Sequence, residues 1–176
     1  MRIADELDVA VDLTSMRADD LSEVLEIERV SFSNPWRERD FAYALEADHG
    51  VAHVVRMDGR LVGYSVGFQK GGEFHLADFA IQPGLQRRGY GRALLERLTG
   101  EVSALGLEAI TLEVRQSNQA AVHLYTKAGF QTVAIRRGYY RHPAEDALVM
   151  VKALSGQLSD WVLRSASRMT EIGESD

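Results

Sequence analysis

The 176-residue sequence contains no cysteine and only three prolines. Without a thiol, the protein can form no disulfide, no thiolate metal site and no covalent intermediate on sulfur. The five histidines show no metal-ligand spacing, so no metal is expected. The sequence has no long apolar run and does not begin with a basic and then apolar signal segment, which predicts a soluble cytoplasmic protein without membrane association.

Acidic residues outnumber basic ones, 26 to 20, which gives a formal net charge of −6. A nucleic-acid surface needs a basic stripe, so nucleic acid is not an expected partner, whereas a basic peptide would be attracted. The length fits one domain, which we place at residues 1–154. An extension over residues 155–176 is expected to form a short helix and a frayed tail. We expect a monomer or a weak homodimer.

Helix and strand signals alternate along the chain, which predicts a mixed α+β fold. Asp58-Gly59 joins two strand-like runs as a hairpin turn, and Gly106 stands where a helix C-terminal cap belongs. Asp19 or Asp20 is the expected cap of the first helix, and Pro35 the expected first residue of the second. The expected strands are 9–16, 51–57, 61–69, 74–81, 110–115, 130–137 and 146–153; the expected helices are 19–31, 35–47, 89–104 and 119–128.

A glycine-containing loop, Gln86-Arg87-Arg88-Gly89-Tyr90-Gly91-Arg92, separates an expected strand from the leucine-rich helix. Free amides at a helix N-terminus bind anions, so this loop suits a pyrophosphate, with the three arginines adding positive charge. The dinucleotide-binding fingerprint and the P-loop are both excluded, because Leu94 stands where the former needs glycine and the sequence contains no Gly-Lys-Ser/Thr. The alternative is an ordinary turn with solvated arginines.

Two residues further along are candidates for proton transfer. Glu113 lies in an otherwise apolar strand, where burial would raise its pKa towards that of a general base. Its structural alternative is an ion pair with Arg115 on the same strand face. Tyr125 lies on the inner face of the next helix, from which its phenol can donate a proton to a leaving group. Its structural alternative is simple core packing.

These motifs together resemble the GNAT superfamily of N-acetyltransferases, whose signature Gln/Arg-x-x-Gly-x-Gly/Ala is matched by Gln86, Gly89 and Gly91. The resemblance narrows to the RimI-type ribosomal-protein alanine N-acetyltransferases and covers about residues 14–153. It rests on Ser31-Phe32-Ser33-Asn34-Pro35-Trp36, Leu112-Glu113-Val114-Arg115-Gln116-Ser117-Asn118, Ala120-Ala121, Leu124-Tyr125, Gly129-Phe130, Arg136-Arg137-Gly138-Tyr139-Tyr140 and Glu145-Asp146-Ala147.

The resemblance implies a strongly twisted mixed sheet flanked by helices and splayed between its fourth and fifth strands, with acetyl-CoA held in the gap. A bulge in the fourth strand would open the gap and aim a backbone N–H at the thioester. The implied coenzyme contacts are Phe79, Ala80 and Ile81 beside the pantetheine arm, Arg87, Arg88, Gly89, Tyr90, Gly91 and Arg92 at the pyrophosphate, and Asn118. Ser117 or Asn118 is also the expected cap of the following helix.

The resemblance also implies that Tyr125 is the general acid. Phe32, Trp36, Tyr139 and Tyr140 become candidate walls for an extended peptide end, with core packing as the alternative. Adjacent aromatic residues on a strand should point to opposite faces, which favours exposure of at least one tyrosine. Glu145 and Asp146 beside them are expected to attract a basic N-terminus.

The expected activity is direct transfer of acetyl from acetyl-CoA to a protein N-terminal α-amine, with a ribosomal protein beginning with alanine as substrate. One alternative acceptor is a lysine side chain, a polyamine or a small-molecule amine. A second alternative is a non-catalytic acyl-CoA sensor, which would need the phosphate loop but neither Glu113 nor Tyr125.

Overall fold

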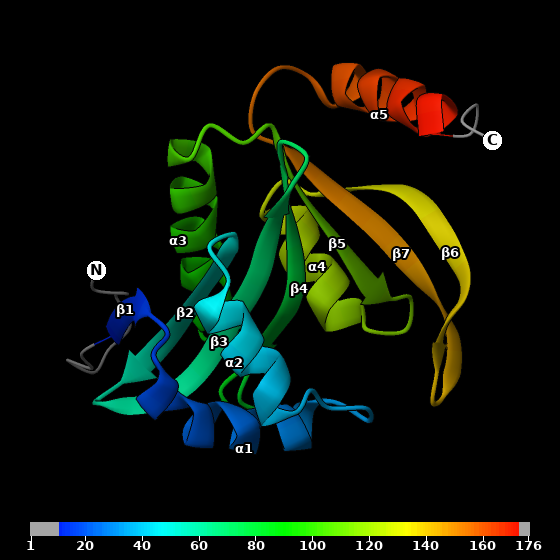
Figure 1. Cartoon of the computed structure of the whole chain (residues 1–176). Helices are drawn as coiled ribbons and strands as arrows, with labels where there is room; N and C mark the ends of the chain where they lie inside the picture. The colour runs from blue at the N-terminus through cyan, green and yellow to red at the C-terminus, as the bar shows by residue number, and fades with distance from the viewer. Residues whose placement is uncertain (1–10, 173–176) are drawn as a thin grey trace.

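The computed structural model describes residues 11–172, with side chains to Ser165. A seven-stranded sheet with the order β1-β2-β3-β4-β5-β7-β6 forms its centre (Figure 1). Neighbouring strands are antiparallel except β4 and β5, which are parallel, so the predicted mixed α+β fold is confirmed. The strands are β1 Val11–Ser15, β2 Gly50–Met57, β3 Arg60–Lys70, β4 Glu73–Ile81, β5 Ala109–Arg115, β6 Gln131–Arg141 and β7 Ala144–Ala153.

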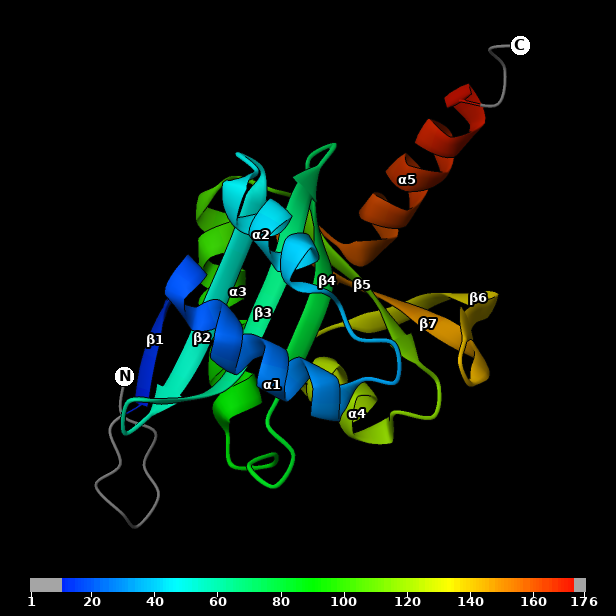
Figure 2. The same cartoon turned by 60° about the horizontal axis from the view of Figure 1, so that its bottom comes forward.

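Helices cover both faces of the sheet (Figures 1 and 2). Helices α1, Leu21–Ser31, and α2, Glu38–Glu46, lie on one face, while α3, Tyr90–Ala104, and α4, Gln119–Lys127, lie on the other. None of the helices in the described part of the chain is long and apolar enough to cross a membrane.

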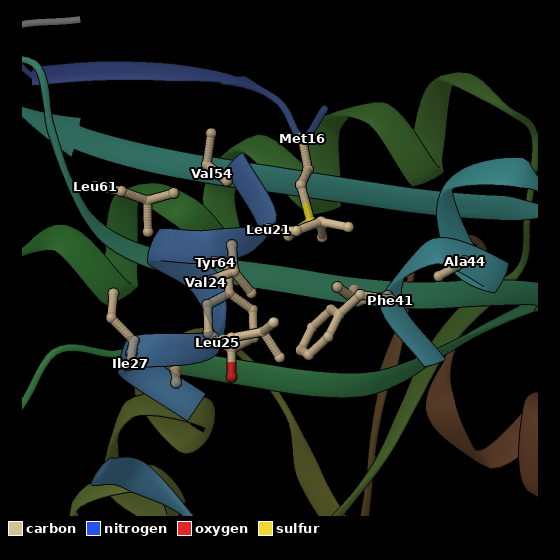
Figure 3. Packing of buried hydrophobic residues seen from close by; sticks show 12 residues of the cluster. Met16, Leu21, Val24, Leu25, Ile27, Phe41, Ala44, Val54, Leu61 and Tyr64 are labelled. Carbon is tan, nitrogen blue, oxygen red and sulfur yellow. The ribbon is translucent and has the colours of Figure 1, made fainter. Parts of the chain in front are cut away.

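Alternation along the strands supplies a separate core for each face. On the α1/α2 face, Phe41 of α2 packs edge-on against Tyr64 of β3, with Val24 of α1 and Val54 of β2 beside them (Figure 3). On the α3/α4 face, Leu98 of α3 belongs to a larger cluster that includes residues from β2, β4, β5 and β7. The phosphate-loop helix is thereby fixed to the sheet by its apolar side.

The two N-terminal helices begin differently from the prediction. Helix α2 begins at Glu38 rather than at Pro35, because the Asp40 carboxylate accepts a hydrogen bond from the backbone N–H of Arg37 at 2.8 Å. Asp20 accepts a similar bond from the Arg17 N–H at 2.8 Å, and this interaction starts a 3₁₀ turn over Ala18–Asp20 that leads into α1. In both cases a carboxylate at the end of the first turn determines the residue at which the helix begins.

The C-terminal helix α5, Leu158–Ile172, has fifteen residues and is longer than expected. Trp161 anchors its first turns, since its ring packs with Ala109 and Val151 and its indole N–H donates to the Glu73 carboxylate at 3.0 Å. The expected frayed tail after it, and the start of the first expected strand at residues 9 and 10, lie outside the described residues.

The sheet splays between β4 and β5, as expected. Three residue pairs join the two strands, from Glu73↔Ala109 to His75↔Thr111, after which the strands separate. Just beyond this point β4 contains a bulge, because Val66 of β3 is opposite Asp78 and Gly67 is opposite Leu76, which leaves Ala77 unmatched. The bulge and the separation produce a wedge-shaped opening in the middle of the sheet.

Candidate active site

The predicted phosphate loop lies at the wide end of this opening. Gly89 is the N-cap residue of α3 with φ of 90°, in the left-handed region where a Cβ is unfavourable, and Arg87 also has a positive φ of 64°. The free amides of the first turn of α3 therefore face the loop, where an anion can bind them. Arg87, Arg88 and Arg92 are exposed, and Arg92 pairs with Glu96 at 2.8 Å.

Two residues of the loop, Tyr90 and Gly91, have a structural role. Tyr90 packs into the core, and Gly91 leaves room for a neighbouring helix. The buried Tyr90 ring packs into the core and its hydroxyl points to Met57 Sδ at 2.8 Å, so only its backbone is available to a ligand. Gly91 is helical, and a Cβ there would stand 3.0 Å from Leu124 Cδ2 of α4. Gly91 is thus required for the close approach of α3 to α4.

The strand edge beyond the bulge offers its backbone to a ligand. Ala80 and Ile81 are buried in the cores of the two opposite faces, and Phe79 is half-buried against Tyr125, with ring centroids 6.0 Å apart. The β4 edge that faces the opening has backbone groups with no ladder to β5, and an amide-containing arm can pair with such groups. This geometry fits the pantetheine of acetyl-CoA.

Glu113 of β5 has a side chain that is 10% exposed and holds two cationic or protonatable partners. Its Oε2 lies 2.6 Å from His75 Nε2, and its Oε1 lies 3.2 Å from an Arg136 guanidinium nitrogen. The His75 hydrogen bond outweighs burial and lowers the pKa of Glu113, with further lowering by the charge of Arg136. The expected raised pKa is therefore wrong, and the carboxylate is ionised at neutral pH.

The alternative of an ion pair between Glu113 and Arg115 is also not observed. Arg115 instead pairs with Glu145 at 3.2 Å and donates to the backbone carbonyls of His142 and Pro143. Its guanidinium carbon lies 4.1 Å from the centroid of the Tyr140 ring. Arg115 thus holds the β6–β7 turn rather than the candidate base.

Tyr125 is buried, as predicted, with its ring 5.6 Å from that of Phe130. Burial raises the pKa of Tyr125 well above its usual range, with smaller contributions from Asp78 and Tyr140, so the phenol keeps its proton at neutral pH. Asn118 caps this helix, since its side chain accepts from the Ala121 N–H at 3.2 Å. The phenol therefore carries the proton that a general acid needs.

The acid and base candidates lie on opposite faces of β5. Leu112 and Val114 pack with Tyr125 in the α3/α4 core, so the intervening Glu113 points to the α1/α2 face. A reacting group between the two residues must therefore lie within the opening, with proton acceptor and donor on its two sides.

The aromatic candidates divide between two segments, the α1–α2 loop and the end of β6, which a hydrogen bond connects. Phe32 is 37% exposed. Trp36 is half-buried, and its ring centroid lies 5.2 Å from that of Phe41, so Trp36 also has a packing role. The Ser33 hydroxyl donates to the His142 carbonyl at 2.6 Å, and this bond ties the α1–α2 loop to the β6–β7 turn.

Tyr139 and Tyr140 do not point to opposite faces, so that prediction is wrong. Their rings contact each other edge-on at 5.1 Å, because β6 shifts register against β7 between Arg136 and Tyr140 and Gly138 adopts φ of 59°. The irregularity breaks the two-residue alternation. Tyr139 is 45% exposed, and burial raises the pKa of Tyr140 to about 12.

Glu145 and Asp146 are less available to a basic ligand than predicted. Glu145 accepts from Arg115 and from the Ser117 N–H at 2.5 Å, and Asp146 accepts from Arg137 and the Gly138 N–H, both at 2.8 Å. Neighbouring arginines therefore offset both charges.

A buried polar cluster next to the bulge was missed from the sequence. The Tyr64 hydroxyl donates to Glu28 Oε2, the Trp36 N–H donates to Glu28 Oε1 at 2.6 Å, and the buried Asp78 carboxyl interacts electrostatically with Glu28. Burial, then the charge of Glu28, raises the pKa of Asp78 to about 8. Asp78 interrupts an apolar strand just as Glu113 does, so the same signal would have found it.

Among the described residues, no group of three or more histidine, aspartate or glutamate side chains is placed to hold a metal ion. His75 and Arg136, the two partners of Glu113, were also not predicted. His75 alternates with buried Phe74 and Leu76, which marks it as facing away from their core.

Comparison with known proteins identifies the family of this chain. The sequence model of the acetyltransferase (GNAT) family matches residues 21–130, and the chain belongs to this family. It is an acetyl-CoA-dependent N-acetyltransferase.

Among its relatives, the [ribosomal protein bS18]-alanine N-acetyltransferase of Escherichia coli strain K12 is 34% identical over 145 residues, which are 81% of this chain and 97% of that protein. The N-alpha-acetyltransferase RimI of Mycobacterium tuberculosis is 37% identical over 122 residues, 66% of this chain and 75% of the relative. The crystal structure of the E. coli enzyme aligns with a TM-score of 0.77 at 33% identity, covering 84% of this chain and 96% of that one.

More distant structures share the fold. Arabidopsis thaliana NAA60 in complex with acetyl-CoA aligns with a TM-score of 0.74 at 17% identity, over 84% of this chain and the whole of the other. The predicted GNAT fold and the RimI-type resemblance are thus confirmed.

Proposed function

We propose that this protein acetylates the N-terminal alanine of a ribosomal protein in the cytoplasm, using acetyl-CoA as donor. The observation that carries the proposal is the placement of Glu113 and Tyr125 on opposite faces of β5, at the opening where the strands separate. Similarity to the bacterial bS18-alanine acetyltransferases over most of the chain supports the acceptor. The bound acetyl-CoA supplies a thioester, whose carbonyl carbon accepts the amine.

In the proposed reaction the protein supplies proton transfer and charge stabilisation. The ionised Glu113 belongs to the base that removes a proton from the substrate ammonium, directly or through one water, which leaves the amine free to attack. A backbone N–H beyond the Ala77 bulge donates to the thioester oxygen, where negative charge develops. Tyr125 then donates its proton to the departing sulfur as the C–S bond breaks, and the second proton that the nitrogen loses on becoming an amide restores the Tyr125 phenol.

The coenzyme is held largely by backbone groups in this proposal. The loop around Gly89 and the first turn of α3 bind the pyrophosphate, with Arg87, Arg88 and Arg92 adding charge. The β4 edge over Phe79, Ala80 and Ile81 pairs with the pantetheine amides, and Asn118 provides a further contact.

The acceptor peptide enters between the α1–α2 loop and the β6–β7 turn. Phe32, Trp36, Tyr139 and Tyr140 form its walls, and the Ser33–His142 bond links the two segments beside them. An extended chain end fits such a bounded entrance, and the net charge of −6 favours a basic terminus.

The test compares two peptides by mass spectrometry after incubation with acetyl-CoA. One begins with Ala-Arg; the other is the same peptide with its α-amine blocked and an internal lysine supplied. We expect α-amine labelling of the first peptide and little labelling of the second. With Glu113→Gln and the same incubation time, the first peptide should show no labelling above background. Equal or faster labelling of the blocked peptide would refute the N-terminal assignment in favour of a lysine acceptor.

A further inference from the structure

His75 occupies the point where the sheet begins to open. It is the last β4 residue paired with β5, opposite Thr111, and the bulge at Ala77 follows two residues later. Since Phe74 and Leu76 are buried in the α3/α4 core, His75 points to the other face, as Glu113 does. The pairing of β4 with β5 therefore brings the imidazole and the carboxylate together, with Nε2 2.6 Å from Oε2.

Glu113 alone is poorly suited to accept the proton. An α-ammonium has a pKa of about 7.7–8.0, whereas the pKa of Glu113 lies below the ordinary glutamate value of 4.5. Transfer from the ammonium to this carboxylate is therefore unfavourable by more than three pK units. In addition, the Glu113 side chain is only 10% exposed, which limits release of a proton to solvent.

His75 has the properties that Glu113 lacks. An imidazole has two nitrogens, one of which can donate a hydrogen bond to a carboxylate while the other accepts a proton. The His75 side chain is 40% exposed, so it connects the nearly buried carboxylate with solvent. The arrangement is that of a carboxylate orienting a histidine.

We infer that His75 and Glu113 together form the base of the acetyl transfer, with His75 holding the proton and releasing it to solvent. This inference rests on the proposed function. One N–H bond of the ammonium breaks and one N–H bond forms on the imidazole, giving an imidazolium beside the Glu113 carboxylate. In this protonated pair, His75 Nε2–H donates a hydrogen bond to Glu113 Oε2. The proton taken from the ammonium is on Nδ1, from which it passes to solvent. His75 therefore gains and loses one proton in each turnover.

The surrounding charges keep the proton on the imidazole rather than on Glu113. Arg136 of β6 holds the other carboxylate oxygen at 3.2 Å and favours the anion. Tyr139 and Tyr140 of β6 interact electrostatically with Glu113, and both have raised pKa values, chiefly through burial, so they remain neutral. From β3, the residue paired with His75 is the uncharged Phe68.

The experiment measures kcat/KM for the Ala-Arg peptide from about pH 5.5 to about 9, a range that brackets imidazole and α-amine titration. It compares the parent with His75→Asn and with His123→Asn, a matched change at an exposed histidine of α4. The His75→Gln variant repeats the test with a longer amide side chain. Acetyl-CoA affinity, measured by calorimetry, reports whether each variant retains the folded coenzyme site.

We expect kcat/KM of the parent to fall on the acid side, because the pair must be unprotonated to accept a proton. In His75→Asn the rate at pH 7.5 should drop about tenfold or more, and the acid limb should move down by more than one pH unit, since the remaining Glu113 stays ionised there. Imidazole added to His75→Ala should restore part of the rate. His123→Asn should match the parent.

An acid limb at the same pH in parent, His75→Asn and His75→Gln would overturn the inference, whatever the loss of rate, because a merely structural role lowers the rate without moving the limb. Failure of the parent to label the α-amine of the peptide would refute the proposed function instead. Labelling of the peptide α-amine by the parent enzyme therefore shows which of the two proposals has failed.

Discussion

The buried carboxyl pair beside the bulge predicts an unusual dependence of stability on pH. Asp78 is 8% exposed, and burial, with the nearby charge of Glu28, raises its pKa from 3.8 to about 8. The folded protein therefore binds a proton that the unfolded chain has lost. The stability that this proton contributes is fully present below about pH 4 and is lost as the pH rises towards 8. The direction is opposite to that of an aspartate in a salt bridge.

The magnitude follows from the size of the pKa change. Each pK unit corresponds to about 1.4 kcal/mol, so the free energy of unfolding should fall by about 2 kcal/mol between pH 6 and pH 8 from this proton alone. Asparagine has nearly the same shape and cannot ionise. The Asp78→Asn variant should therefore gain about 2 kcal/mol relative to the parent over the same range.

Urea unfolding followed by fluorescence of the two tryptophans, at several pH values between 6 and 8, measures this difference. The matched control is Asp48→Asn, an exposed aspartate whose substitution should leave the pH dependence unchanged. If parent and Asp78→Asn differ by a constant amount at every pH, the carboxyl is not protonated in the folded state and the reasoning fails.

Two further predictions concern catalysis and packing. Glu113→Gln and Tyr125→Phe should each slow acetyl transfer by on the order of a hundredfold while retaining acetyl-CoA binding by calorimetry, because each removes a proton-transfer group; full activity of either variant at neutral pH would exclude that residue. Gly91→Ala places a Cβ 3.0 Å from Leu124 Cδ2, whereas a Cβ at Gly100 of the same helix meets nothing within 4 Å. Gly100→Ala should raise the free energy of unfolding by about 0.5–1 kcal/mol, and Gly91→Ala should gain less or lose stability, in urea titrations; equal gains would contradict the close helix contact.

Sequence reasoning could predict the candidate site because its main features are local. The phosphate loop depends on a strand, a glycine turn and a helix that follow one another, and the orientation of Tyr125 follows from the periodicity of one helix. The face and identity of Glu113 similarly follow from one strand. These relations do not require knowledge of the partner strands.

The errors arose where distant segments meet. The pKa of Glu113 is set by His75, on another strand, and by Arg136, on a strand later in the chain, and neither contact follows from the local pattern. The orientation of Tyr139 and Tyr140 depends on a register shift against β7, which the alternation rule does not include. Topology, rather than propensity, determines both features.

The joint between β4 and β5 has a consequence for how the enzyme responds to mutation. Three backbone pairs link the two halves of the sheet, and the apolar cluster around Leu98 of α3 packs against both halves. The angle between β4 and β5 therefore depends on the volume of the side chains in this cluster. Trimming a side chain in this cluster would change the spacing between Glu113 and the thioester without removing any group that touches either substrate. Since a misplacement of about 1 Å can lower a rate on the order of a hundredfold, substitutions in the hydrophobic core can behave as active-site mutations.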